Sequence, residues 1–260
     1  MKTEHKDMMK ARRRNIRLLV AYDGGRYHGF QRQKPPVVAV QNVLEDKLAV
    51  VFGDSIELAA AGRTDAGVHA YGQVVNFFTD GSIPVERIAR AVNSLLPSDI
   101  VVRQAMEEDF SFSARHSAKS KTYIYRIRQG AVPDPFSRQY AWYIRSALSV
   151  PSMQAAMQQI LGTHDFSSFR AAGGAPMSPV RTMYEVQCSQ QDGFIEMRFW
   201  ANGFLYHMVR NLVGTLVSVG LGRMDQAGFA AVLAAGDRQK ASATAPPEGL
   251  YLYQVNYDDE

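Results

Sequence analysis

Hydrophobic and polar residues follow two periods along the chain, a period of two that predicts strands and a period of about 3.6 that predicts helices. In the first half these periods predict a strand at 16–22, a helix at 40–52, strands at 55–60 and 73–78, a helix at 85–96 and a strand at 100–105. The resulting order, β-α-β-β-α-β, is typical of the ferredoxin-like fold.

The second half of the chain repeats this arrangement loosely. The pattern there predicts strands at 122–128, 139–144, 180–188, 194–200 and 251–257, and helices at 152–161, 204–220 and 226–235. Two α/β half-domains that share one sheet account for both the length and the number of elements. We place these half-domains at 16–110 and 111–260, and we expect a ligand to bind in a cleft between them.

The composition is that of an ordinary soluble globular protein, with 260 residues of which 46% are hydrophobic and 21% charged. The longest apolar run, 212–221, is shorter than the ~20 residues that a membrane-spanning helix needs. The first fifteen residues are charged and lack the apolar segment of a signal peptide. We therefore expect a flexible basic arm at 1–15 and a cytoplasmic protein with no membrane partner.

Charge and cysteine content exclude several kinds of site. The single cysteine, Cys188, excludes an internal disulfide and any metal site built from several cysteines. The six histidines form no HxH or HxxxH pair, so a metal site has little support. The sequence also contains no GxxxxGK[ST] phosphate-binding loop and no GxSxG nucleophile motif. A net charge of +4 is compatible with a polyanionic partner but does not select one.

The most unusual segment is AGRTDAGVHA at 61–70, which lies between two predicted strands that a short hairpin would connect. Its glycines allow backbone angles that are closed to other residues and a close approach by a ligand. Arg63 lies two residues before Asp65, and a nearby cation favours the ionised carboxylate that a nucleophile or base requires. The alternative is a polar turn with a solvated Arg–Asp pair.

Two further segments carry candidate functional residues. In KSKTYIYR at 119–126, Tyr123, Tyr125 and Lys121 lie on one side of a strand, as a stacked base and its phosphate require. The alternative is a half-buried tyrosine pair in a sheet. In NGFLYHMVRN at 202–211, Arg210 lies among apolar residues and needs a partner, with Asp65 one option, unless its side chain reaches the surface.

These segments together resemble the tRNA pseudouridine synthase A family. The resemblance rests on AGRTDAGVHA at 61–70, KTYIY at 121–125, FLYHMVRNLVGTL at 204–216 and ATAPPEGLYL at 243–252. It continues in AYDGGRYHGFQRQ, VNSLLP, FSARHSA and DFSSFR, in the same order along the chain from residue 16 to 257. A collinear set of this length is more specific than any one of its motifs.

The resemblance implies a cytoplasmic isomerase that converts uridines 38, 39 and 40 of the tRNA anticodon stem-loop to pseudouridine. It implies an α+β fold of two ferredoxin-like (RRM-like) half-domains, with a mixed, mainly antiparallel central sheet, flanking helices and a central active-site cleft. It also implies a homodimer with no metal and no organic cofactor.

The family's catalytic aspartate falls on Asp65, the tyrosine that packs on the target base on Tyr123, and the arginine that pairs with the aspartate on Arg210. We add Arg63 as a candidate phosphate contact. Asp65 would attack the ribose C1′ or C6 of the base, or would accept a ribose proton during glycal formation. The competing hypotheses are an RNA-binding module with an inactive site and an isomerase that acts on another RNA.

Overall fold

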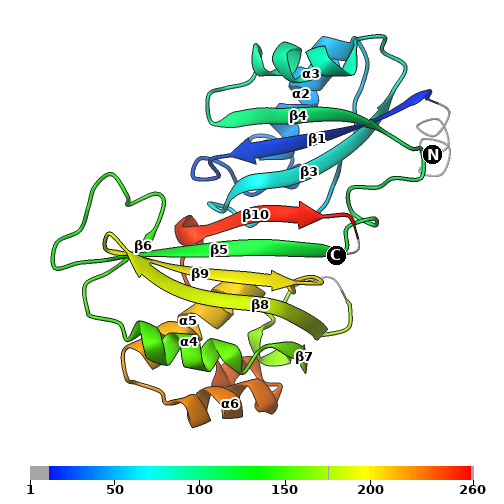
Figure 1. Ribbon diagram of the computed structural model, residues 1–260. Helices are drawn as coiled ribbons and strands as arrows, with labels where there is room; N and C mark the ends of the chain where they lie inside the picture. The colour runs from blue at the N-terminus through cyan, green and yellow to red at the C-terminus, as the bar shows by residue number, and fades with distance from the viewer. Residues whose placement is uncertain (1–11, 175, 259–260) are drawn as a thin grey trace. The chain divides into compact units, whose positions relative to one another are not determined.

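The structure is a computed structural model that describes residues 12–174 and 176–258 (Figure 1). The chain divides into two units, Met1–Ala118 with Gln254–Glu260, and Lys119–Tyr253. The described residues form ten strands and five helices, which confirms the predicted α+β class. None of these helices is long and apolar enough to cross a lipid bilayer.

In the first unit, two helices pack on a small antiparallel sheet. The elements are β1 (Arg14–Tyr22), α2 (Val40–Phe52), β2 (Ala59–Ala60), β3 (His69–Thr79), α3 (Val85–Asn93) and β4 (Ile100–Glu108). The strand order is β4-β1-β3, with β2 paired to β3. The predicted order β-α-β-β-α-β is therefore confirmed. The core contains alternate residues of β1 and one side of each helix, including Ile16, Leu18, Leu44, Leu48 and Ile88.

The predicted bounds of α2 are confirmed, but the strand predicted at 55–60 is wrong over its first four residues. Only Ala59–Ala60 pairs with β3. The backbone of Leu58 is bonded to α2 instead, because its N–H donates to Glu45 Oε1 at 2.9 Å and its carbonyl accepts from Gln41 Nε2 at 3.3 Å. Side chains of the helix thus satisfy backbone groups that would otherwise pair with a strand.

The described residues of the second unit form six strands, five in the order β10-β5-β9-β8-β7 and a sixth, β6, which pairs in parallel with β5. Its elements are β5 (Ser120–Gln129), β6 (Trp142–Ile144), α4 (Val150–Gln158), β7 (Gly162–Asp165), β8 (Val180–Gln191), β9 (Phe194–Ala201), α5 (Met208–Gly220), α6 (Gln226–Ala235) and β10 (Leu250–Asn256). The last three residues of β10 belong to the first unit. Figure 1 shows α4, α5 and α6 on the same side of β8 and β9.

Three predictions for this unit need correction. The helix predicted from 204 begins at Met208, because His207 has a left-handed backbone with φ of 58°. The strand predicted at 139–144 covers only Trp142–Ile144, since the Tyr140 N–H donates to Ser137 O in a turn. Strand β7, with the polar sequence GTHD, was not predicted.

The predicted basic arm falls mostly on residues 1–11, which lie outside the described residues. Residues 12–15 belong to the first unit, and Arg14 and Asn15 are the first residues of β1. Arg12 Nη2 lies 2.7 Å from Asp54 Oδ2, and Arg14 Nη2 lies 2.8 Å from Glu107 Oε2.

Candidate active site

The segment at 61–70 connects β2 to β3 in the first unit and contains a tight turn. Gln73 Nε2 donates to Gly62 O at 2.8 Å and holds the start of the segment against β3. The Val68 N–H donates to Asp65 O at 3.1 Å and closes a four-residue turn. Asp65, half-buried, is the first residue of this turn, so the position of its side chain depends on the position of Val68.

A second segment, residues 22–33 at the end of β1, supports this turn from outside. The Phe30 N–H donates to Thr64 O at 3.1 Å, and the hydroxyls of Tyr22 and Thr64 lie 2.7 Å apart in the core. Thr64 is thus held through both its backbone and its side chain. Because Thr64 directly precedes Asp65, these bonds restrict the backbone that carries the carboxylate.

Glycines allow the two segments to approach closely. A Cβ on Gly24 would lie 1.9 Å from Val68 O, and a Cβ on Gly29, which has φ of +87°, would lie 2.8 Å from Thr64 O. His69 Nδ1 lies 3.1 Å from the Gly24 nitrogen and 3.0 Å from Asp23 Oδ1. His69 is buried, so it connects the two segments on their core side.

Arg63 is exposed and donates from Nε to Gln31 Oε1 at 2.9 Å. This bond connects Arg63 to the 22–33 segment rather than to Asp65.

Sequence reasoning did not assign functional support to Tyr22, Gly24 or Gly29. The signal that could have identified these residues is the pair of glycines, Gly24 and Gly25, directly after the first strand.

In the second unit, Tyr123 lies on β5 opposite Phe199 of β9 and is 8% exposed. Its ring meets the ring of Phe204 edge to face, with centroids 4.9 Å apart. Tyr125 is fully buried, and its hydroxyl donates to Pro246 O at 2.8 Å. Burial raises the pKa of Tyr125. Of the two tyrosines, Tyr125 therefore has a structural role in the core.

Arg210 lies in the first turn of α5, where the 243–249 segment orients it. Its Nε donates to Ala245 O at 2.7 Å, while the Ala245 N–H donates to Arg210 O at 3.0 Å. Its Nη1 lies 3.4 Å from His207 Nε2. The segment runs so close to α5 that a Cβ on Gly214 would lie 1.9 Å from Ala243 O.

Asn211 is a buried polar residue that sequence reasoning missed. Its Nδ2 donates to Phe169 O at 2.8 Å, and its Oδ1 accepts from Thr244 Oγ1 at 2.6 Å and from Arg238 Nη2 at 3.0 Å. These bonds join three of the motifs in the sequence, DFSSFR, FLYHMVRNLVGTL and ATAPPEGLYL. An asparagine flanked by apolar residues within such a motif is the signal that could have identified it.

The candidate residues therefore fall into two groups, each described within its own unit. Asp65 and Arg63 lie on the loop of the first unit. In the second unit, Tyr123 lies on β5 and Arg210 lies in the first turn of α5. Within the described ranges, no cluster of three or more His, Cys, Asp or Glu side chains could hold a metal ion.

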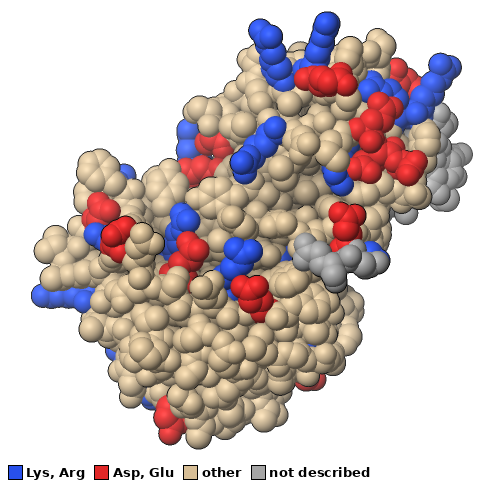
Figure 2. Space-filling view, in the orientation of Figure 1, with Lys and Arg blue, Asp and Glu red and all other residues tan. Residues whose placement is uncertain are grey.

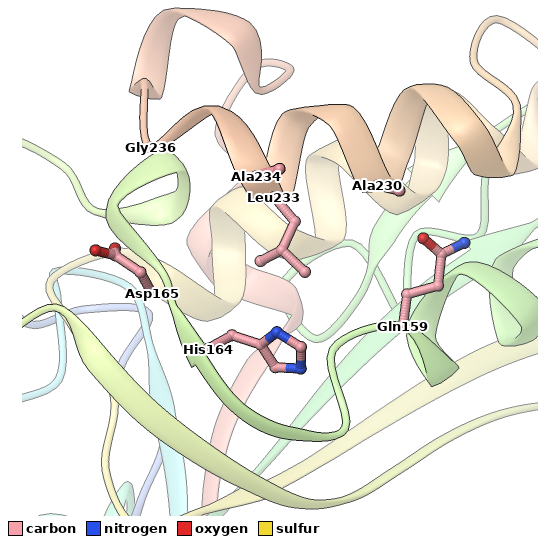
Figure 3. Close-up of a pocket in the computed structure, with 7 residues that line it drawn as sticks. All are labelled: Gln159, His164, Asp165, Ala230, Leu233, Ala234 and Gly236. Carbon is pink, nitrogen blue, oxygen red and sulfur yellow. The ribbon is translucent and has the colours of Figure 1, made fainter.

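A cavity of about 330 Å³ opens elsewhere in the second unit, between α4, β7 and α6 (Figure 3). It is lined by Gln159, His164, Asp165, Ala230, Leu233, Ala234 and Gly236. Its polar groups already have partners in the fold, since His164 Nε2 lies 2.7 Å from Leu161 O and Asp165 Oδ1 accepts from the Ser167 N–H at 2.7 Å. None of the candidate residues lines this cavity.

On the face seen in Figure 2, Lys and Arg side chains are interspersed with Asp and Glu, and the surface over α4 and α6 carries few charges. A polyanion that binds this face would therefore contact small groups of Lys and Arg side chains and not one continuous basic surface.

The comparison with family models places this α+β protein in the pseudouridine synthase class. The family model for tRNA pseudouridine synthases matches residues 18–117 and 156–258, which include Asp65 and Arg210. The chain therefore belongs to the tRNA pseudouridine synthase family, and the resemblance predicted from the motifs is confirmed.

Relatives that align along nearly the whole chain support this assignment. The chain is 46% identical to tRNA pseudouridine synthase A of Thermoanaerobacter sp. (strain X514) over 244 residues, which cover 94% of this chain and 100% of that protein. It is 43% identical to tRNA pseudouridine synthase A of Bacillus subtilis (strain 168) over 246 residues, 94% of this chain and 99% of that protein.

Proposed function

We propose that this protein converts uridines 38, 39 and 40 in the anticodon stem-loop of tRNA to pseudouridine, with Asp65 as the nucleophile. The reaction breaks the bond between N1 of uracil and the ribose C1′ and forms a bond from C5 to C1′. The base must detach, rotate and reattach without leaving the site. A uridine in a stem must first leave its stack, which costs a few kcal/mol that contacts in the pocket offset.

The observation that carries this proposal is the way the Asp65 turn is fixed. Bonds to Thr64, Gly62 and Val68 restrict its backbone, and Gly24 and Gly29 let a second segment support it without intervening side chains. A carboxylate that attacks C1′ or C6, or that accepts a ribose proton, has to be held at a fixed place relative to a flipped nucleoside. Asp65 is half-buried, so part of the residue remains accessible to such a ligand.

Arg210 and Tyr123 take supporting roles in this proposal. Arg210 would pair with the Asp65 carboxylate and keep it ionised, because an opposite charge nearby favours the charged form. Its bond to Ala245 O fixes the direction of the guanidinium in advance. Tyr123 would stack on the target base, and its edge-to-face contact with Phe204 limits the rotation of its ring. Arg63 is proposed as a phosphate contact because it is exposed on the same loop as Asp65.

Two further parts of the proposal follow from the family resemblance. We expect a homodimer, which light scattering after size-exclusion chromatography would test. We also expect activity without a metal or an organic cofactor, which should persist after dialysis against a chelator.

The test uses purified protein and unmodified tRNA transcripts that carry a single uridine at position 38, 39 or 40. Carbodiimide treatment followed by primer extension maps pseudouridine at each position. Asp65→Asn, which removes the charge at nearly the same shape, should bind tRNA but form no product. The matched control is Asp46→Asn on the exposed side of α2, which should keep full activity.

Activity in Asp65→Asn equal to that of the wild type would refute the nucleophile. Binding of tRNA by the wild type without product would support the RNA-binding module instead. Product in other RNAs but none at these three tRNA positions would support the isomerase with a different substrate.

A further inference from the structure

Two arginines of the second unit converge on the same short stretch of backbone. Arg170 Nη1 donates to Met177 O at 3.2 Å. Arg181 Nη1 donates to Ser178 O at 2.8 Å and to Val180 O at 2.6 Å, and its Nη2 lies 3.0 Å from Met177 Sδ. We call Arg170 and Arg181 the arginine pair.

The guanidinium of Arg181 lies near the positive charge of Arg170 and is not bonded to an acidic group among the described residues. Within the described residues, every hydrogen-bond acceptor of Arg181 is uncharged, two carbonyls and a thioether. Burial, and then the positive charge of Arg170, lower the pKa of Arg181 from its usual value. Like charges held close together are unfavourable unless an anion joins them.

Both arginines adjoin backbone that is hydrogen-bonded or paired within the second unit. Arg170 directly follows Phe169, which is fully buried and whose carbonyl is bonded to Asn211. Arg181 is paired with His164 in the β7–β8 ladder. Because both backbones are fixed, the two guanidiniums stay close to each other at little further entropic cost.

The loop at 202–207 connects the arginine pair to the candidate active-site residues of the same unit. A Cβ on Gly203 would lie 3.5 Å from Arg181 Nε, and the next residue, Phe204, touches Tyr123. Further along this loop, the Tyr206 carbonyl accepts from the Ala171 N–H at 3.0 Å, one residue after Arg170. The arginine pair and Tyr123 therefore lie on either side of one short loop.

We propose that the arginine pair binds a backbone phosphate of the tRNA substrate, close to the nucleotide that Tyr123 receives. Guanidiniums suit this role, because their planar N–H groups match two oxygens of a phosphate and they stay charged at all physiological pH values. The exposed ring of Tyr206, which lies against His207 in a tilted arrangement with centroids 4.0 Å apart, borders the same surface. The proposal rests on the proposed function, because it assumes that tRNA is the substrate.

The test replaces Arg181 with glutamine and measures tRNA binding over a range of salt concentrations. At physiological salt, Arg181→Gln should weaken binding about tenfold, since a hydrogen bond to a charged group is lost. The slope of log affinity against log salt should become shallower by about 0.7 to 0.9, the share of one phosphate. The turnover rate at saturating tRNA should stay within about twofold of the wild type.

Arg223→Gln is the matched control. It removes the same charge at an exposed site beyond the other end of α5, about 20 Å away along the 13-residue helix. It should leave both affinity and salt slope unchanged. Arg181→Lys keeps the charge and should restore most of the slope. Thermal unfolding of each variant checks that the fold is intact.

An unchanged affinity or an unchanged slope in Arg181→Gln would overturn the phosphate site. Equal losses in Arg181→Gln and Arg181→Lys, with a lowered unfolding temperature, would also overturn it and assign Arg181 to packing of the loop. The proposed function fails separately, if the wild type forms no pseudouridine in tRNA. In that case a shallower salt slope in Arg181→Gln would still support the phosphate contact.

Discussion

Replacing Gly24 with alanine should reduce pseudouridine formation about 100-fold, although Gly24 is not itself a catalytic residue in this proposal. The added Cβ would lie 1.9 Å from Val68 O and 2.6 Å from Val68 C. Non-bonded carbon and oxygen atoms do not approach closer than 3.0 Å in practice. Because both clashing atoms belong to the backbone, no side chain can rotate away, and the two segments must separate by about 1 Å.

That separation would move Asp65. The Val68 N–H is bonded to Asp65 O at 3.1 Å, and the neighbouring Gly67 N–H is bonded to Tyr27 O at 3.3 Å. A shift of Val68 therefore passes through the turn to the carboxylate. Misplacement of a reacting group by 1 Å costs on the order of 100-fold in rate. Overpacking of this kind also costs about 1–3 kcal/mol of stability, which a folded chain of this size can tolerate.

The assay is single-turnover pseudouridine formation at saturating enzyme, together with thermal unfolding. Gly25→Ala is the control, because its Cβ would meet only the Asp23 Oδ1 atom, at 3.1 Å, at the end of a side chain. Gly25→Ala should keep activity within a few-fold of the wild type. A folded Gly24→Ala protein with the wild-type rate would refute the argument, and so would an equal loss in both variants.

Three further predictions concern stability and reactivity. Asn211→Leu should lower the free energy of unfolding by about 3 kcal/mol, because the hydrogen bonds of the Asn211 side chain to Phe169 O, Thr244 and Arg238 are lost. A loss below about 1 kcal/mol in denaturant titration would contradict this. Burial raises the pKa of Cys188 from 9.0 to about 12, so iodoacetamide near pH 8 should alkylate the folded chain far more slowly than the unfolded chain. For the same reason, the stability that this thiol contributes should fall as the pH rises above about 9. The hydrogen bond from Arg14 lowers the pKa of Glu107, so the stability that Glu107 contributes is present above its pKa in the unfolded chain and is lost as the pH falls through its pKa in the folded chain. Because the pair is partly exposed, Glu107→Gln should remove less than about 1 kcal/mol of stability at pH 7. It should also reduce the loss of stability that the wild type shows at acid pH.

Elements with a clear apolar period were the ones that the sequence predicted well. The bounds of α2 and α6 were predicted without error, since a glycine with a left-handed backbone ends each helix, at Gly53 and Gly236. Elements that depend on distant partners were predicted poorly. Strand β7 has no apolar alternation and is defined by its pairing with β8. Strand β2 does not extend back to Leu58, because side chains of α2 bond to the Leu58 backbone.

Prediction of the candidate site divided in the same way. Arg63, Asp65 and Arg210 were identifiable because charged residues are unusual in their surroundings, and the motifs that resemble the family supplied the predicted roles of Asp65, Tyr123 and Arg210. Their supports were not, because contacts such as Tyr22 with Thr64 or Arg210 with Ala245 join residues far apart in the sequence. Without an apolar period or a charged pair to mark them, such contacts appear only when the chain is folded.

The length of the loop at 61–70 follows from these supports. A two-residue hairpin would connect β2 to β3, but its backbone bonds would all be made within the hairpin. The longer loop instead leaves the Thr64 carbonyl, the Gly67 N–H and the Val68 carbonyl facing the 22–33 segment, where two are hydrogen-bonded and the third lies against Gly24. Asp65 is thereby held from two sides while its own side chain makes none of these backbone contacts. The additional residues thus hold the backbone around Asp65 through main-chain contacts of its neighbours, as the proposed role of nucleophile requires.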